Sequence, residues 1–288
     1  MQRRRIVYRM STRPGLTTAI RLAVAAYRRD NASRFGAALA FYIIFSIAPT
    51  LLIAIAIAGS LFGRQQAERE ILDRVSGSFG SAAGVAIAAM IKDAATTRAG
   101  WLASLLGLMT LYFGLAGVYR QVDDALRTIW GRRPERRVGT IRTIRRRLGS
   151  MLLVIGAGVV VLVSVVADAV IAVTGRYAAA RLVGGELLWH AAQLLVSTLV
   201  LTVLFAAVFH YLARAPWGDV RVGAAVTAIL FVIGKFALGI YLGKAAVGSA
   251  FGAAGSLVVV LLWAYWSAQI FFFGLEFTHV YSREHLAQ

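Results

Sequence analysis

The chain has 288 residues, of which 59% are apolar and only 15% are charged. Soluble domains contain about 25% charged residues, so this composition excludes an ordinary soluble protein. The net charge of +18 indicates an anionic partner, and the absence of cysteine excludes disulfides, thiolate catalysis and cysteine-ligated metals.

The apolar residues are gathered into long blocks. A helix needs about 20 predominantly apolar residues to cross the hydrocarbon core of a bilayer, and six blocks reach that length. The predicted spans are about residues 35–61, 101–120, 149–174, 187–212, 222–243 and 253–278. The sequence therefore predicts an all-α fold, a polytopic membrane helix bundle of six transmembrane helices within residues 35–280.

Residues 1–34 form a basic segment before the first span. Apolar side chains recur there at helical spacing, at Leu16, Ile20, Val24 and Tyr27. This pattern predicts an amphipathic helix that lies at the membrane interface, with Arg21, Arg28 and Arg29 toward the lipid headgroups.

The first span contains Pro49, in the stretch FSIAPTLL. Proline removes one backbone donor and obstructs the carbonyl four residues earlier, so we expect a kink. Ser46 can satisfy backbone groups freed nearby. Pro49 and Ser46 are candidates for a gating hinge, and a kink that serves packing alone is the alternative.

Two connecting segments stand out. Residues 64–98 are too polar to span, but apolar residues keep a helical spacing in them, which predicts two short external helices. Residues 121–148, after the second span, form a strongly basic loop.

The charge distribution predicts the orientation. Most of the 31 Lys and Arg residues lie in 1–34, in 121–148 and in the other segments outside the spans that are predicted on the same side of the membrane. Because basic residues concentrate in cytoplasmic loops, both termini, including the tail 281–288, are predicted to be cytoplasmic. Residues at these flanks meet anionic headgroups, and no aromatic platform accompanies them, so membrane lipid is the expected partner and nucleic acid is not.

Lys235 lies inside the fifth predicted span, in ILFVIGKFALGIYL. A helix rises 1.5 Å per residue, which places Lys235 about 20 Å from the cytoplasmic end. Asp168 in the third span and Gln193 in the fourth are predicted at a similar depth. The three residues are therefore candidates for a polar pocket, and a lysine that reaches the outer interface is the alternative.

Glu276 and Gln269 lie in the sixth span, seven residues apart, on roughly one face of the helix. Both are candidates for substrate binding or transport. The alternative for Glu276 is an interfacial carboxylate paired with a basic neighbour, with His210 and Arg214 predicted at the same depth.

Three stretches carry a resemblance to a known family. They are ASRFGAALAFYIIFSIAPTLLIAIAIAGSLFG, then QVDDALRTIWG, and then the run from VGAAVTAILFVIGKFALGIYL through FGAAGSLVVVLLWAYWSAQIFFFGLEFT. Together they resemble the YihY/virulence factor BrkB family of bacterial inner-membrane proteins. Where members often have Gly-Ala-Glu, this chain has Gly274-Leu275-Glu276. The resemblance implies a six-span protein of the inner membrane.

Members of that family are often labelled ribonuclease BN. A metal-dependent nuclease needs clustered His and Asp ligands, whereas the four histidines here are widely spaced. We therefore expect no enzyme activity, no metal and no cofactor. The favoured function is transport of an amphiphilic or anionic solute, with lipid among the candidates. The alternatives are a non-transporting cell-envelope scaffold and, third, the ribonuclease. The sequence leaves the solute and homo-oligomerisation open.

Overall fold

The structure is a computed structural model that describes residues 15–79, 84–85, 87–89, 91–92, 100–131, 185–213, 215–244 and 255–282. Across these ranges every regular element is helical, so the all-α prediction is confirmed for them. The predicted third span, 149–174, and the tail beyond Ser282 lie outside the described residues.

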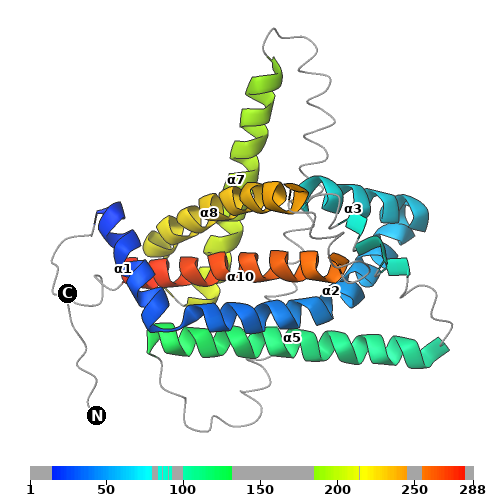
Figure 1. The fold of residues 1–288 in the computed structure, drawn as a ribbon, viewed down its shortest axis with the longest axis horizontal. Helices are drawn as coiled ribbons and strands as arrows, with labels where there is room; N and C mark the ends of the chain where they lie inside the picture. Colours follow the sequence, from blue (N-terminus) through cyan, green and yellow to red (C-terminus); the bar gives the residue numbers. More distant parts are fainter. Residues whose placement is uncertain are drawn as a thin grey trace.

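The long helices are packed side by side as a bundle (Figure 1). They are α1 (Leu16–Arg29), α2 (Ala32–Phe62), α3 (Arg64–Phe79), α5 (Gly100–Trp130), α7 (Gly185–Ala213), α8 (Trp217–Lys244) and α10 (Gly255–Ser282).

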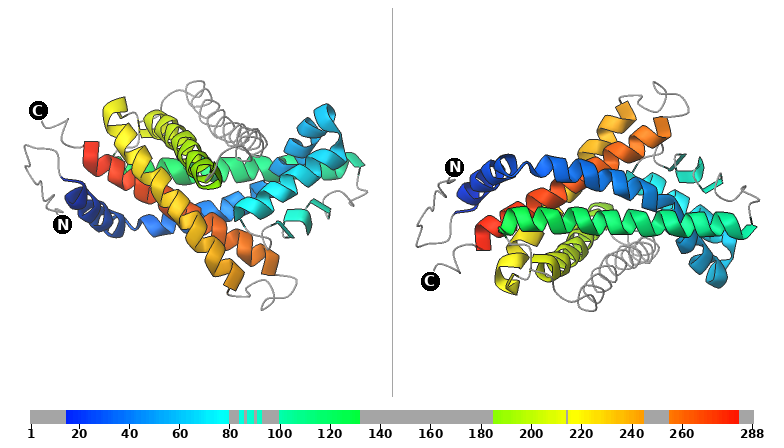
Figure 2. Two further views of the ribbon diagram at one scale, coloured as in Figure 1. Left: turned by 90° about the horizontal axis from the view of Figure 1, so that it is seen from above. Right: turned by 90° about the horizontal axis from the view of Figure 1, so that it is seen from below.

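Helix α10 is the central element. It packs between α2 and α8, α5 lies along α2, and α1 crosses the carboxyl-terminal part of α10 (Figures 1 and 2). Helices α2 and α8 begin at the end of the bundle where α5 and α10 finish. Consecutive spans that cross a membrane in alternating directions have this arrangement.

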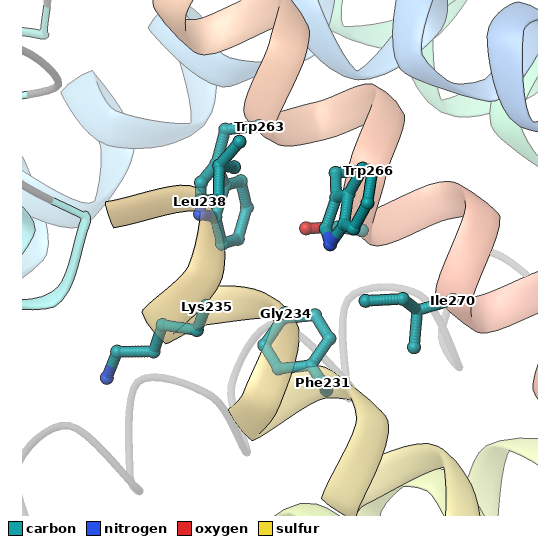
Figure 3. A pocket seen from close by; sticks show the side chains of 8 residues that line it. Phe231, Gly234, Lys235, Leu238, Trp263, Trp266 and Ile270 are labelled. Atoms are coloured by element: carbon teal, nitrogen blue, oxygen red, sulfur yellow. The ribbon is translucent and has the colours of Figure 1, made fainter. Parts of the chain in front are cut away.

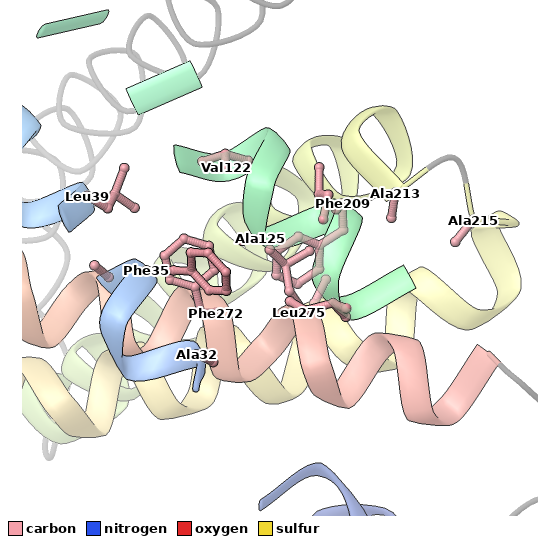
Figure 4. Packing of buried hydrophobic residues seen from close by; sticks show 14 of the residues in the cluster. Ala32, Phe35, Leu39, Val122, Ala125, Phe209, Ala213, Ala215, Phe272 and Leu275 are labelled. Carbon is pink, nitrogen blue, oxygen red and sulfur yellow. The ribbon is translucent and has the colours of Figure 1, made fainter. Parts of the chain in front are cut away.

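The main apolar core lies at that same end (Figure 4). Helices α2, α5, α7, α8 and α10 all contribute to it. Phe35 of α2 packs against Phe272 of α10, with ring centroids 6.0 Å apart, and Phe209 of α7 and Ile129 of α5 are fully or almost fully buried beside them. The core therefore fixes how five helices meet.

Helix α5 is longer than the predicted second span, 101–120. It continues to Trp130, so the first ten residues of the predicted loop 121–148 are helical. Their apolar face, including Leu126 and Ile129, is buried in the core, and Arg127 bonds to Asp123 one turn earlier at 2.7 Å. Gly131, with φ of 62°, ends the helix in the left-handed conformation.

Helices α8 and α10 approach each other closely through two reciprocal contacts. The side chain of Thr278 lies over Gly223, and that of Thr227 lies over Gly274. Each threonine hydroxyl donates to the carbonyl of the glycine four residues earlier in its own helix, at 2.7 Å. Because small residues let the backbones approach, this seam is the close contact expected between membrane helices.

Helix α1 presents two different apolar faces. The buried face is made of alanines, Ala19, Ala23 and Ala26, and it packs toward α10 around Phe277. Of the stripe predicted from the sequence, Leu16, Ile20 and Val24 are exposed instead, at 56%, 39% and 38%, and Tyr27 is half-buried. Alanine permits close packing against protein, and the exposed stripe leaves apolar surface for a membrane interface.

The predicted external segment covers the other end of the bundle. Helix α3 follows α2 directly, and Ile87 and Ile91 are buried against Ile55 of α2 and Val260 of α10. The apolar spacing in 64–98 therefore corresponds to a face packed on the bundle.

Three described helical segments are long and apolar enough to cross a bilayer. They are Leu194–Ala213, Trp217–Leu242 and Leu257–Ser282, with mean hydropathies of 2.1, 2.1 and 1.8. At most 33% of their most apolar stretches is buried within the bundle, so much of their apolar surface faces outward. Such a surface is suited to lipid. A shorter apolar segment, Ala32–Ile47, begins α2.

Candidate functional site

Lys235 lines a small pocket between α8 and α10, called here the lysine pocket (Figure 3). Its cavity volume is about 10 Å³, which is room for about one water molecule. Its walls are Phe231, Gly234, Lys235 and Leu238 of α8 with Trp263, Trp266, Ser267 and Ile270 of α10. A Cβ at Gly234 would lie 2.6 Å from Ile270 Cδ1, so glycine is required for this close approach of the two helices.

The side chain of Lys235 is half-buried at the edge of this pocket. Figure 3 shows its aliphatic stem beside the pocket and its ammonium directed away from Trp266 and Ile270. Trp263, which contacts Phe231 edge to face at 6.1 Å, fills space between the helices. The lysine therefore supplies a cation at the rim of an otherwise mostly apolar pocket.

A larger pocket adjoins the first and shares Trp266 and Ile270 with it. This pocket, called here the α1 groove, has a cavity volume of about 260 Å³ and is open to the outside. Its walls are Tyr27 of α1, Leu230 of α8, and Trp266, Gln269, Ile270 and Phe273 of α10. Together the two pockets follow the side of the α8–α10 seam from Lys235 to α1.

Gln269 is the polar centre of the α1 groove. The Tyr27 hydroxyl donates to Gln269 Oε1, and Gln269 Nε2 donates to the Ser33 carbonyl at 3.2 Å. A Cβ at Gly36 would lie 2.6 Å from Gln269 Nε2, so the amide occupies space that only glycine leaves free. One side chain of α10 thus bonds to both α1 and the start of α2.

Tyr27 itself was not a predicted site residue. Its ring packs on Phe273 with centroids 6.1 Å apart. Burial raises the pKa of Tyr27 to about 12, and the nearby Tyr265 and Glu276 add to this effect. Tyr27 ends the apolar stripe of α1, and a hydroxyl at the end of such a stripe is the one signal that could have found it.

Glu276 is fully buried, with 0% of its surface exposed. Its charge adds to the raised pKa of Tyr27, which burial dominates, and to the raised pKa of Arg29, which the hydrogen bond with Asp30 dominates. His210 has other contacts: its Nδ1 is 2.8 Å from the Ala215 carbonyl and its ring stacks on Trp217. The Arg214 side chain lies outside the described residues, so its predicted pairing with Glu276 stays a prediction.

Two further buried polar residues, not predicted from the sequence, lie at this end of the bundle. His279 is buried and its ring lies 4.7 Å from that of Trp130 in α5. Asp219, in the first turn of α8, is 2% exposed, and its Oδ2 has no hydrogen-bond partner in the described part of the chain. Both residues lie near helix ends. Because polar residues near a helix end are as common in solvent as in a buried site, the sequence does not indicate that they are buried.

Two predicted residues cannot be placed against Lys235. Asp168 lies outside the described residues, and so does the side chain of Gln193, whose backbone belongs to α7. In Figure 1, α7 crosses α8 steeply and its amino-terminal part extends beyond the other helices. The predicted group of Lys235, Asp168 and Gln193 therefore stays a prediction.

Helix α2 continues as a helix through Pro49. Ser46 donates to the carbonyls of Tyr42 and Ile43, at 3.1 and 3.0 Å, in the turn that precedes the proline. A Cβ added at Gly114 of α5 would lie only 2.9 Å from the Cβ of Ser46, so the two helices are in close contact at this point. Ser46 thus serves the α2–α5 contact as well as the backbone, and the hinge role of both residues stays a prediction.

Among the described residues, no group of three or more His, Cys, Asp or Glu side chains could hold a metal ion. His285 and the His190 side chain lie outside them. The described sites accordingly offer apolar walls, a few hydrogen-bonding groups and one lysine.

An all-α bundle with helices long and apolar enough to cross a bilayer defines an integral membrane protein. Residues 23–288 match the family described as Virulence factor BrkB. Since the match covers nearly the whole chain, the protein belongs to this family. No curated protein and no solved structure matched the chain.

Proposed function

We propose that the protein transports an amphiphilic or anionic solute across the bacterial inner membrane, through the pockets along the α8–α10 seam. The observation that carries this proposal is the position of Lys235 at the rim of a pocket between two apolar helices. A lysine near the centre of a span costs about 2.5–3.5 kcal/mol on insertion, so such a residue is expected to have a functional reason.

The residues have distinct roles in this proposal. Lys235 counters the negative charge of the solute, and Asp168 or Gln193 sets its charge state or orientation. Gln269 offers hydrogen bonds in the adjoining α1 groove, and Glu276 lies two turns nearer the end of α10. Separately, Pro49 and Ser46 let α2 bend as the pathway opens.

The proposal includes six spans, with both termini and the basic loop in the cytoplasm. It draws support from the alternating directions of α2, α5, α8 and α10 and from the concentration of Arg at their shared end. Anionic headgroups are the proposed partners of the basic segments.

The test replaces Lys235 with Met in the full-length protein reconstituted into vesicles. The matched control is Ile233→Met, an exposed position of the same helix. Movement of a fluorescent, chain-labelled phosphatidylglycerol between leaflets should be lost in Lys235→Met and kept in Ile233→Met, with unchanged thermal unfolding in both. Normal movement in a folded Lys235→Met variant would remove the proposal.

A non-transporting envelope scaffold is the second candidate. The direction of the Lys235 ammonium, away from Trp266 and Ile270, favours it (Figure 3). If the protein is a scaffold, Lys235 has no solute to bind, and removing its charge from a membrane helix should leave the free energy of unfolding unchanged or raise it. Lys235→Met should therefore be neutral or stabilising. We propose no enzyme activity. Metal-dependent RNA cleavage that persists through purification and is lost on replacing His279 would contradict this.

A further inference from the structure

The α1 groove is an open, mostly apolar surface on two helices that are suited to a bilayer. Five of its six lining residues belong to α8 and α10, which are long and apolar enough to span, and the groove opens outward. Trp266, in its wall, is 43% exposed. Lipid chains are suited to cover such an apolar surface within the hydrocarbon region.

The polar end of the groove is formed by α1. Tyr27 and Gln269 are hydrogen-bonded to each other there and present a hydroxyl and an amide beside the apolar walls. Successive residues of a helix are rotated by 100° about its axis. Going around α1 from its alanine face, one next meets Tyr27 and the aliphatic stripe. Arg21 and Arg28, both exposed, come next.

This order puts positive charge on the side of α1 that follows its apolar stripe. Arginine forms charge-assisted hydrogen bonds with phosphate, and a basic residue near an anionic membrane surface contributes about 1 kcal/mol. The apolar groove, the hydroxyl and amide at its end and the adjacent arginines match, in sequence, the chain, ester region and phosphate of one phospholipid.

We propose that the α1 groove binds one acyl chain of an anionic phospholipid from the leaflet on which α1 lies, with its phosphate held by Arg21 and Arg28. This site names the class of substrate for the proposed function. Binding of the lipid does not depend on that function, whereas transport of the bound lipid does. Through the shared Trp266 and Ile270, the bound lipid lies next to the lysine pocket.

The experiment uses full-length protein in phosphatidylethanolamine vesicles that contain an increasing fraction of phosphatidylglycerol with a photoreactive acyl chain. Crosslinks are mapped by mass spectrometry. Labelling of Leu230 and Ile270 should saturate, because a site fills, while labelling of Ile229, which is 51% exposed outside the groove, should rise linearly. Linear labelling of Leu230 and Ile270 would overturn the proposal without any variant.

Matched variants test the walls and the charge. Leu230→Trp fills the groove and should abolish the saturable labelling of Ile270, whereas Ile229→Trp should leave it unchanged. Arg28→Gln should raise the fraction at half-saturation about fivefold. Photoreactive phosphatidylethanolamine should bind more weakly than phosphatidylglycerol. Equal saturation by both lipids, or saturable labelling that survives in folded Leu230→Trp, would contradict the proposal.

Lipid movement is measured in the same vesicles, and its result is independent of the labelling. Saturable labelling without movement supports the binding site and contradicts the proposed transport. Movement with only linear labelling supports transport and contradicts this site.

Discussion

The contact between Tyr27 and Gln269 ties α1 to the central helix α10, and Gln269 extends it to the Ser33 carbonyl of α2. The partners lie 242 positions apart in the chain. Sequence spacing identified Gln269 as a polar residue inside a span, but it could not supply a partner so distant. At the scale of single residues, side-chain polarity is readable from the sequence and the pairing is not.

Replacing Tyr27 with Phe tests this contact. The variant loses one hydrogen bond to Gln269 and should unfold about 1 kcal/mol more easily near neutral pH. Because the pKa of Tyr27 is raised from 10.0 to about 12, the stability that its neutral form contributes is complete below pH 10. It is then lost as the pH rises toward 12.

The difference in melting temperature between Tyr27→Phe and the unaltered protein should therefore shrink between pH 10 and pH 12. Tyr211→Phe, at an exposed position of α7, is the control for removing a tyrosine hydroxyl elsewhere in the bundle. A Tyr27→Phe difference that stays constant or grows over this range would argue against a hydrogen bond donated by Tyr27.

At the scale of elements, periodicity and length identified the helices, and packing decided their ends. The second span was predicted to finish near residue 120, where charged residues begin, but α5 continues to Trp130. Its last turns carry Leu126 and Ile129 on one face, and burial of that face in the core sustains the helix. A hydropathy pattern cannot distinguish a charged helical end from a loop.

The α8–α10 seam gives a prediction at this scale. Gly223→Val adds a branched side chain where Thr278 already lies, so it should destabilise the folded protein by about 1–3 kcal/mol through overpacking. Gly239→Ala is the control in the same helix, because a Cβ there meets nothing within 4 Å. Thermal unfolding in detergent should show a large fall in melting temperature for Gly223→Val only. An equal effect of both substitutions would show that the seam is not the close contact inferred here.

At the scale of the whole molecule, α10 organises the bundle, since α1, α2 and α8 all pack on it (Figure 2). Helices α2 and α8 start where α5 and α10 finish, and the exposed apolar surface of the spanning segments faces outward. Charge alone predicted which of the two ends is cytoplasmic.

The orientation can be measured with single cysteines, because the chain has none of its own. Thr17 in α1 and Gln66 in α3 are exposed and lie near opposite ends of α2. In intact cells, a membrane-impermeant thiol reagent should label Gln66→Cys, and it should label Thr17→Cys only after the inner membrane is opened. Labelling of both positions in intact cells, or the reverse order, would contradict cytoplasmic termini.

The sequence by itself determined the class of this protein. Long apolar blocks can be stable only as helices in lipid, and basic flanks predict their orientation, because both effects depend on local composition. It also identified Lys235 and Gln269, because a polar group inside an apolar block is visible in one dimension.

Only the tertiary structure decided that Lys235 and Gln269 line adjoining pockets and that Tyr27 closes one of them. It also decided that alanines, rather than the larger aliphatic residues, pack α1 against the bundle. These features depend on the rotation of each helix about its axis and on contacts between distant segments. Interlocking side chains set both, and no periodicity within a single helix specifies its partner.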